Sequence, residues 1–147
     1  MKVLEHKLQQ LLQKGCMCIL EYSDSELLFK ASPDKWSKKE ILGHLIDSGI
    51  NNLQRFTEIQ FKEKPYSFES YSQNELVKAN GYQNASIKEL LDFWKSINNR
   101  ILYLFSIQNE ETLSFKIILD TGDSFDLRFL MEDYVSHLEY HLNQIFA

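Results

Sequence analysis

Residues that interrupt helices are scarce in this 147-residue sequence, which contains only two prolines and five glycines. No stretch approaches the roughly 20 apolar residues that a membrane-spanning helix needs. The first residues, 1–13, alternate polar residues with leucines and lack the apolar core of a signal peptide. We therefore expect a cytoplasmic protein, rich in long helices, that has no contact with a membrane.

Positive charge is also limited. Lys and Arg number 16 against 21 for Asp and Glu, which gives a net charge of −5. The densest basic group is the short cluster of Lys35, Lys38 and Lys39. Because proteins that bind nucleic acids need a clustered positive field, we predict no nucleic-acid partner.

Cysteine is restricted to Cys16 and Cys18. Positions two residues apart on a helix point about 200° away from each other, so this pair cannot form a disulfide or share a metal ion. We interpret both as free thiols, buried or half-buried. The remaining composition, with 44% apolar and 13% aromatic residues, is typical of one globular domain covering residues 1–147. A chain of this size can bury enough surface to fold without a metal or a disulfide.

Apolar residues recur at helical spacing in four long segments, which predicts helices at about 3–21, 38–63, 87–106 and 126–146. A shorter helix at 73–80 is predicted to end before Gly81, a residue that suits the position after a helix. Asp126 or Ser124 is expected to cap the last helix. Four Ser-x-x-Glu sequences match the capping box, in which two side chains bond free N–H groups at a helix start. They begin at Ser23, Ser37, Ser72 and Ser86.

The segment 112–125 has a different pattern. Phe115, Ile117 and Leu119 alternate with polar residues, and the turn-forming sequence 120–123 follows. This pattern favours a short hairpin or extended loop before the last helix. The predicted fold class is therefore all-α, a four-helix bundle with a short extra helix and this hairpin or loop.

Two of the four histidines, His137 and His141, are four residues apart in the last predicted helix. This spacing brings both imidazoles to one face, where they can bind one metal ion. Both lie at the edge of the apolar face of the helix. Asp133 lies one turn before His137 and Gln144 is close, an arrangement that resembles a metal site with a supporting carboxylate. The alternative is a pair of half-buried histidines bonded to backbone or water.

His44 belongs to a polar stripe of the helix predicted at 38–63. The other members of the stripe are Glu40, Asp47, Asn51 and Arg55. The stripe is either a face in solvent or the lining of a wet cleft inside the bundle. In the second case, three histidines from two helices have the ligand count of a catalytic site for Zn²⁺ or a similar ion, and Asp47 as a fourth ligand would make the site structural. His6 has no partner at a useful spacing, so we expect it at the surface.

Two motifs resemble signatures of the DinB/YfiT-like family of proposed metalloenzymes. The first is Trp36-Ser37-x-x-Glu40-x-x-Gly43-His44-Leu45-x-Asp47-Ser48, and the second is Asp133-Tyr134-x-x-His137-x-x-x-His141-Leu142-x-Gln144-Ile145. The helix with Trp94 between them also agrees with the family, so the resemblance covers nearly the whole chain. It implies a four-helix bundle, commonly a homodimer, whose metal is held by His44, His137 and His141.

The family resemblance also implies an activity, because its characterised members include transferases and isomerases that use low-molecular-weight thiols such as bacillithiol or mycothiol. The first hypothesis is therefore a divalent-metal-dependent enzyme with a small-molecule substrate, either a thiol S-transferase or a hydrolase. Its cofactors would be Zn, Ni or Fe and, for the transferase, such a thiol. Asp47 and Asp133 could orient a ligand histidine or the nucleophile, and Arg55 could bind a carboxylate of a thiol cofactor. The alternative is a stress-response module that binds a metal or small ligand without turnover.

Overall fold

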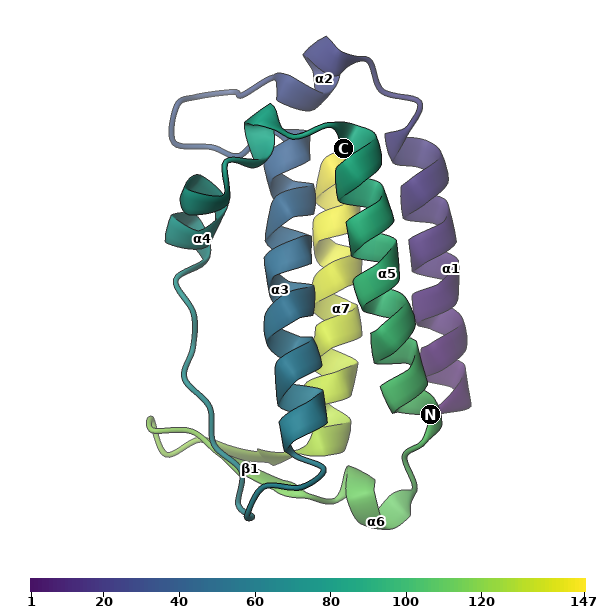
Figure 1. The fold of residues 1–147 in the computed structure, drawn as a ribbon, viewed down its shortest axis with the longest axis vertical. Helices are drawn as coiled ribbons and strands as arrows, with labels where there is room; N and C mark the ends of the chain where they lie inside the picture. Colours follow the sequence, from purple (N-terminus) through teal and green to yellow (C-terminus); the bar gives the residue numbers. More distant parts are fainter.

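Four long helices form the body of the protein in a computed structural model that describes residues 1–147. They are α1 (Lys2–Ile19), α3 (Lys38–Glu58), α5 (Ile87–Ser106) and α7 (Leu127–Phe146). Figure 1 shows them side by side as a bundle, with a two-stranded hairpin before α7. The predicted fold class is confirmed.

The order of the helices in the bundle explains the long connection in the middle of the chain. α3 packs against α5 and α7, and α1 packs against the same two helices. In Figure 1, the neighbouring helices α3 and α5 run in the same direction, opposite to α1 and α7. The chain between α3 and α5, residues 59–86, must therefore return along the length of the bundle. It does so outside α3 and carries α4 (Gln73–Asn80) and the 3₁₀ turn η1 (Tyr82–Asn84).

Two short helices of the structure have no counterpart among the predicted helices, although the capping box predicted at Ser23 is present at the start of one of them. α2 (Asp24–Leu28) follows a complete capping box at Ser23, and α6 (Glu110–Leu113) follows one at Asn109. At five and four residues, neither is long enough to show an apolar period. The predicted hairpin consists of β1 (Lys116–Ile118) and β2 (Ser124–Asp126), which pair antiparallel.

The capping predictions have mixed outcomes. At Ser37 both reciprocal bonds to Glu40 are present, each 3.1 Å long. Ser86 makes only one of the two bonds, by accepting from the N–H of Glu89. The capping box predicted at Ser72 is wrong. Its ψ of 96° differs from the 143–167° of the three serines that do cap helices, and its side chain makes no capping bond.

The helix bounds agree with the sequence for α4 and α5, whereas α3 ends at Glu58 rather than at residue 63. After Glu58 the chain turns so that Tyr66 can join the hairpin: its N–H donates to the carbonyl of Lys116, and its carbonyl accepts from the N–H of Ile118. The Tyr66 hydroxyl also donates to the Glu58 carboxylate at 2.9 Å. This tertiary pairing ends the helix before Pro65 would do so.

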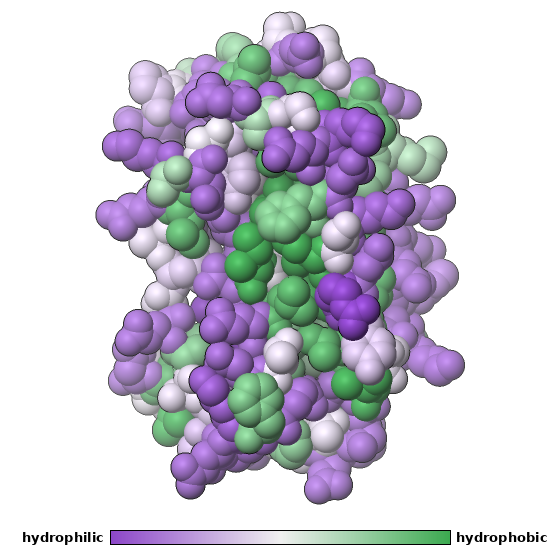
Figure 2. Space-filling view, viewed as in Figure 1, coloured by the Kyte–Doolittle hydropathy of each residue, from purple (hydrophilic) through white to green (hydrophobic).

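A single hydrophobic core lies between the four helices, and its largest fully buried side chains are Trp94, Phe56 and Phe105. Figure 2 shows that apolar atoms also gather on one face of the bundle, over α3 and α5, with hydrophilic side chains on both sides. Cys16 and Cys18 are free and half-buried, as predicted. None of the helices combines the length and apolar content that crossing a bilayer requires.

Candidate metal centre

The structure brings together the three predicted metal ligands. His44 lies near the start of α3, and His137 and His141 lie near the end of α7. Because α3 and α7 are antiparallel neighbours, these two ends meet. One ring nitrogen from each histidine lies within 4.8 Å of the others, and Nε2 of His44 is 3.1 Å from Nε2 of His137.

The closest two of these nitrogens have a spacing near that of ligands to a divalent metal ion. Zinc–imidazole bonds of about 2.1 Å at a tetrahedral angle place two ligand nitrogens about 3.4 Å apart, close to the 3.1 Å between His44 and His137, whereas the full 4.8 Å spread of the cluster has to shorten when an ion binds. The three imidazoles meet edge to face, with ring centroids 4.5–5.0 Å apart, so their nitrogens converge rather than their faces. In addition, Nδ1 of His44 is buried with no hydrogen-bond partner, which is unusual for a polar atom in a protein interior.

Burial favours the neutral form of His44 and His137. His44 has no exposed surface, and desolvation, with the positive charge that His141 and His137 would carry, lowers its pKa to about 3. Burial also lowers the pKa of His137, and the charge of Asp133 opposes that shift. Metal ions bind neutral imidazole, so these two side chains keep their lone pairs available near pH 7.

Two further side chains hold the cluster in place. Nδ1 of His141 lies 2.8 Å from Oε1 of Gln144, an acceptor that selects the tautomer with its free lone pair on Nε2. The ring of Trp36, from the loop before α3, lies 4.8 Å from that of His44 and 6.4 Å from that of His141. Trp36 was predicted only as part of a motif, because spacing along the chain does not show that its ring covers the cluster.

The first part of the polar stripe, Glu40, His44 and Asp47, is buried, whereas Asn51 and Arg55 farther along α3 are half-buried. Asp47, one turn after His44, is only 2% exposed. Its Oδ1 accepts hydrogen bonds from the Tyr82 hydroxyl at 2.5 Å and from Nδ2 of Asn80 at 3.0 Å. Its Oδ2 is buried without a partner. Burial raises the pKa of Asp47, while these two hydrogen bonds lower it.

Gly43 makes this arrangement possible. The ring of Tyr82 lies against α3 at Gly43, where an added Cβ would overlap the ring. The absence of a side chain lets η1 approach α3 closely enough for the Tyr82 hydroxyl to reach Asp47. Neither Tyr82 nor Asn80 could be predicted from the sequence, because they come from a different helical segment and contact Asp47 only in the folded protein.

The other predicted site residues lie farther out. Asp133 is exposed on α7, one turn before His137. Arg55 is eleven residues after His44 on α3, about 16 Å along the helix axis, and the structure does not bring it to the cluster. Its guanidinium donates to the carbonyl of Glu69 at 3.0 Å and stacks on Phe68. His6 is exposed, as expected.

A helical bundle with three converging histidines between two of its helices defines a class of protein that can hold a metal ion. The family model of the DinB superfamily matches residues 7–145, and the chain belongs to this superfamily. No match to a functionally curated protein was found.

Solved structures confirm the fold. YfiT from Bacillus subtilis, described as a probable metal-dependent hydrolase with an unusual four-helix bundle topology, is similar with a TM-score of 0.89 at 19% identity, over 99% of this chain and 83% of that one. The mycothiol-dependent maleylpyruvate isomerase is similar with a TM-score of 0.74 at 10% identity, over 99% of this chain. A histidine-to-alanine mutant of that isomerase gives 0.77 at 11% identity. This chain spans only 60% of the isomerase.

Proposed function

We propose that the protein is a divalent-metal-dependent enzyme whose three-histidine site activates a thiol or a water molecule. The observation that carries this proposal is the convergence of His44, His137 and His141 within 4.8 Å, with His44 fully buried. A group of three imidazoles, one fully buried and two half-buried, is costly to retain for stability alone, since each buried polar atom must be satisfied.

The three histidines would hold the ion through one ring nitrogen each. Imidazole ligands suit Zn, Ni and Fe alike, so the donor set leaves the choice among these metals open. Asp47 does not belong to the group of converging ligand atoms, and its Oδ1 is already held by Tyr82 and Asn80. Three protein ligands are typical of catalytic zinc sites, whereas structural sites have four.

The chemistry would come from the ion together with the residues around it. A bound divalent ion lowers the pKa of a thiol or water molecule that it coordinates, so that a nucleophile forms near neutral pH. Gln144 would hold the tautomer of His141 that presents Nε2 to the ion. The unpartnered Oδ2 of Asp47 would serve as an acceptor that orients His44 or the nucleophile, and Asp133 would act on His137 through its charge. Arg55 lies about 16 Å from His44 along α3, and it remains a predicted binding residue for a carboxylate of a thiol cofactor.

Similar structures supply precedents for both kinds of nucleophile. YfiT is described as a probable hydrolase, a reaction in which water is the nucleophile. The isomerase is described as mycothiol-dependent. We propose the same alternatives here, with a low-molecular-weight thiol as cofactor in the second.

Metal analysis of untagged protein tests the proposal. Wild type should bind about one equivalent of metal, His137→Ala should lose it, and His6→Ala, which changes an exposed histidine, should keep it. A wild type that stays free of metal after incubation with Zn²⁺, Ni²⁺ or Fe²⁺ would overturn the proposal. For metal-loaded protein, a thiol that changes the visible spectrum of the Co²⁺ form supports thiol activation. If no thiol changes the spectrum, the result supports activation of a water molecule.

A further inference from the structure

A cavity of about 480 Å³ lies along the second half of α3, toward the opposite end of the helix from His44. One side of it consists of α3 residues from Asn51 to Lys62, and the other of the chain at 66–71. Its volume is in the range of sites for small molecules, about 300–1,000 Å³. None of the three histidines lines it, so a ligand here occupies a site of its own.

Arg55 lines this cavity and is a half-buried arginine without an acidic partner. The chain contains two other arginines. Arg100 is exposed, and the half-buried Arg128 donates to both carboxylate oxygens of Glu110, at 2.8 and 3.0 Å. Arg55 forms no ion pair, and burial lowers the pKa of its guanidinium. A half-buried charge without a counter-ion is costly, so an anion from outside the chain would stabilise it.

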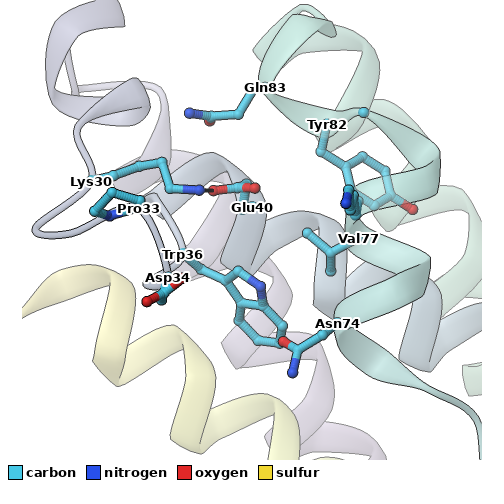
Figure 3. A pocket seen from close by; sticks show the side chains of 11 residues that line it. Lys30, Pro33, Asp34, Trp36, Glu40, Asn74, Val77, Tyr82 and Gln83 are labelled. Carbon is cyan, nitrogen blue, oxygen red and sulfur yellow. Dashed lines mark ion pairs between the residues drawn. The ribbon is translucent and has the colours of Figure 1, made fainter.

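A second cavity, of about 630 Å³ and lined by Trp36, shows the contrast. Its half-buried Lys30 is paired with Glu40 at 3.0 Å, which Figure 3 marks. The other charged residues of its wall, Asp34 and Lys78, are exposed, so water already stabilises them. The charges of that cavity therefore do not call for a ligand, whereas Arg55 does.

The contacts of Arg55 fix its guanidinium and leave most of its donors free. Its Cζ lies 3.9 Å from the ring centre of Phe68 and 5.4 Å from that of Tyr71. One N–H donates to the carbonyl of Glu69 at 3.0 Å. A guanidinium has five N–H donors in a planar fork that matches two oxygens of an anion. The remaining donors of Arg55 have no partner in the protein.

Hydroxyl groups add further unused donors. Ser67, Ser70 and Tyr71 line the same cavity, and the hydrogen bonds among its lining residues involve none of their hydroxyls. Together with Arg55 they give the cavity one strong cation and three neutral donors.

The acidic residues of the wall do not neutralise Arg55. The carboxylate of Glu58 already accepts from Gln54 and from the Tyr66 hydroxyl, and it pairs with Lys62 at 3.0 Å. Glu69 is exposed and forms no ion pair. The positive charge of Arg55 is therefore the one that a ligand would meet unpaired.

We propose that this cavity binds a phosphoryl group, either as free phosphate or as part of an organic phosphomonoester, with Arg55 as its principal partner. A phosphoryl group presents three acceptor oxygens in different directions, which suits a guanidinium fork surrounded by hydroxyls. A carboxylate presents only two oxygens, in one plane. The inference goes beyond the proposed function, because the site lies about 16 Å from His44 along α3. It competes with the prediction that Arg55 binds the carboxylate of a thiol cofactor.

NMR titration of metal-free protein at constant ionic strength tests the proposal, with inorganic phosphate, glycerol phosphate and acetate as probes. Phosphate should shift the backbone N–H signals of residues 54–55 and 66–71 and saturate at about one equivalent. Acetate, the carboxylate probe, should bind roughly tenfold more weakly, because it accepts fewer charge-assisted hydrogen bonds. Tighter binding of glycerol phosphate than of phosphate would identify an organic phosphomonoester as the ligand, and the reverse order would identify free phosphate.

Four variants locate the site. Arg55→Gln should weaken phosphate binding roughly tenfold or more, and Tyr71→Phe, which keeps the ring and removes one hydroxyl, roughly fivefold. Arg100→Gln is the matched control, because Arg100 also lies over a tyrosine ring, that of Tyr103 at 4.8 Å, and forms no ion pair. It should bind phosphate like wild type. His137→Ala should do so as well, since the histidine cluster takes no part.

The inference is overturned if Arg55→Gln binds phosphate like wild type, if acetate binds as tightly as phosphate, or if the shifted signals surround His44 instead. Should Arg55→Gln fail to fold, Tyr71→Phe decides in the same way, because it leaves the hydrogen bond of Arg55 to Glu69 in place. Unchanged phosphate affinity in Tyr71→Phe would then overturn the inference. Each of these results leaves metal binding by the histidines untouched, so the proposed function fails or stands separately.

Discussion

The hydroxyl of Tyr82 donates a 2.5 Å hydrogen bond to Oδ1 of Asp47, and this bond ties the outer connection of the bundle to the helix that carries His44. Both side chains are buried, at 7% and 2% exposure. A carboxylate in this environment depends on its hydrogen bonds, since it has lost the solvation of water. The outer segment thus supports the site without contributing a metal ligand.

Replacing Tyr82 with Phe tests this support. Tyr82→Phe keeps the ring and removes one of the two donors to Asp47, so the free energy of unfolding should fall by about 1–3 kcal/mol. Urea denaturation measures the change. Tyr140→Phe is the control, because Tyr140 is 66% exposed and makes no hydrogen bond, and it should stay within about 0.5 kcal/mol of wild type. Equal stability of Tyr82→Phe and wild type would show that the bond contributes nothing.

Gly43 and Tyr82 should be strongly coupled. Gly43→Ala places a Cβ in the space of the Tyr82 ring and should lower the free energy of unfolding by about 1–3 kcal/mol. In a Tyr82→Ala background the same change meets an open space, and the better helix propensity of Ala makes it neutral or stabilising. Denaturation of the two single variants and the double variant gives the coupling energy. Additive effects of the two substitutions on the free energy of unfolding would contradict the close approach of the Tyr82 ring to Gly43.

Much of the bundle follows from local sequence patterns. The capping box at Ser37 and the end of α4 at Gly81 lie where the sequence predicted them, because each depends on residues within one helical turn. His137 and His141 share a face for the same reason: their spacing is a property of any α-helix. The meeting of this pair with His44 was one of two alternatives that the residues left open, and the family resemblance favoured it.

Features that depend on contacts between distant segments could not be predicted in this way. The stripe with His44 and Asp47 is polar, and its burial depends on Tyr82 and Trp36, which come from other parts of the chain. Likewise, α3 ends early because Tyr66 pairs with the hairpin some 50 residues later. No pattern within either segment encodes these pairings.

Two predicted caps behave differently and provide a matched pair of variants. Asp126 accepts a 2.9 Å bond from the N–H of Phe129 at the start of α7, the helix that carries His137. Asp126→Ala should lower the free energy of unfolding by about 1 kcal/mol. Ser72→Ala should change it by less than about 0.5 kcal/mol, since the Ser72 side chain makes no capping bond. Thermal or urea denaturation of both variants checks the difference, and a larger loss at Ser72 would contradict it.

The neutral state of His44 makes the stability of metal-free protein depend on pH. Its pKa is about 3 in the folded protein against an ordinary value of 6.5, so between these values the unfolded chain binds more protons and stability rises with pH. His44 makes its full contribution to the free energy of unfolding above about pH 6.5 and loses it as the pH falls toward 3. At pH 5 this one group should lower the free energy of unfolding by roughly 2 kcal/mol.

Urea denaturation in a chelating buffer between pH 7 and pH 5 measures this loss. Hydrogen bonds from Gln54, Lys62 and Tyr66 lower the pKa of Glu58 to about 2. This shift changes the free energy of unfolding only below about pH 4.5, the ordinary pKa of the group, so it does not contribute between pH 7 and pH 5. His44→Gln should make the slope shallower and leave the part that the lowered pKa of His137 contributes, and His6→Gln should leave the profile as in wild type. The same slope in wild type and His44→Gln would assign the pH dependence to other groups.

The stacking of Trp36 on His44 should make the fluorescence of this tryptophan a direct reporter of metal binding. Co²⁺ quenches nearby indoles, and the two rings are 4.8 Å apart. Titration of metal-free protein should therefore quench the emission and saturate at about one equivalent. Trp36→Phe should remove most of the quenching and keep the visible bands of bound Co²⁺, because Trp36 contacts the rings of His44 and His141 directly and Trp94, the other tryptophan, contacts none of the three histidine rings. His137→Ala should abolish both signals. Undiminished quenching in Trp36→Phe would place the bound ion elsewhere in the protein.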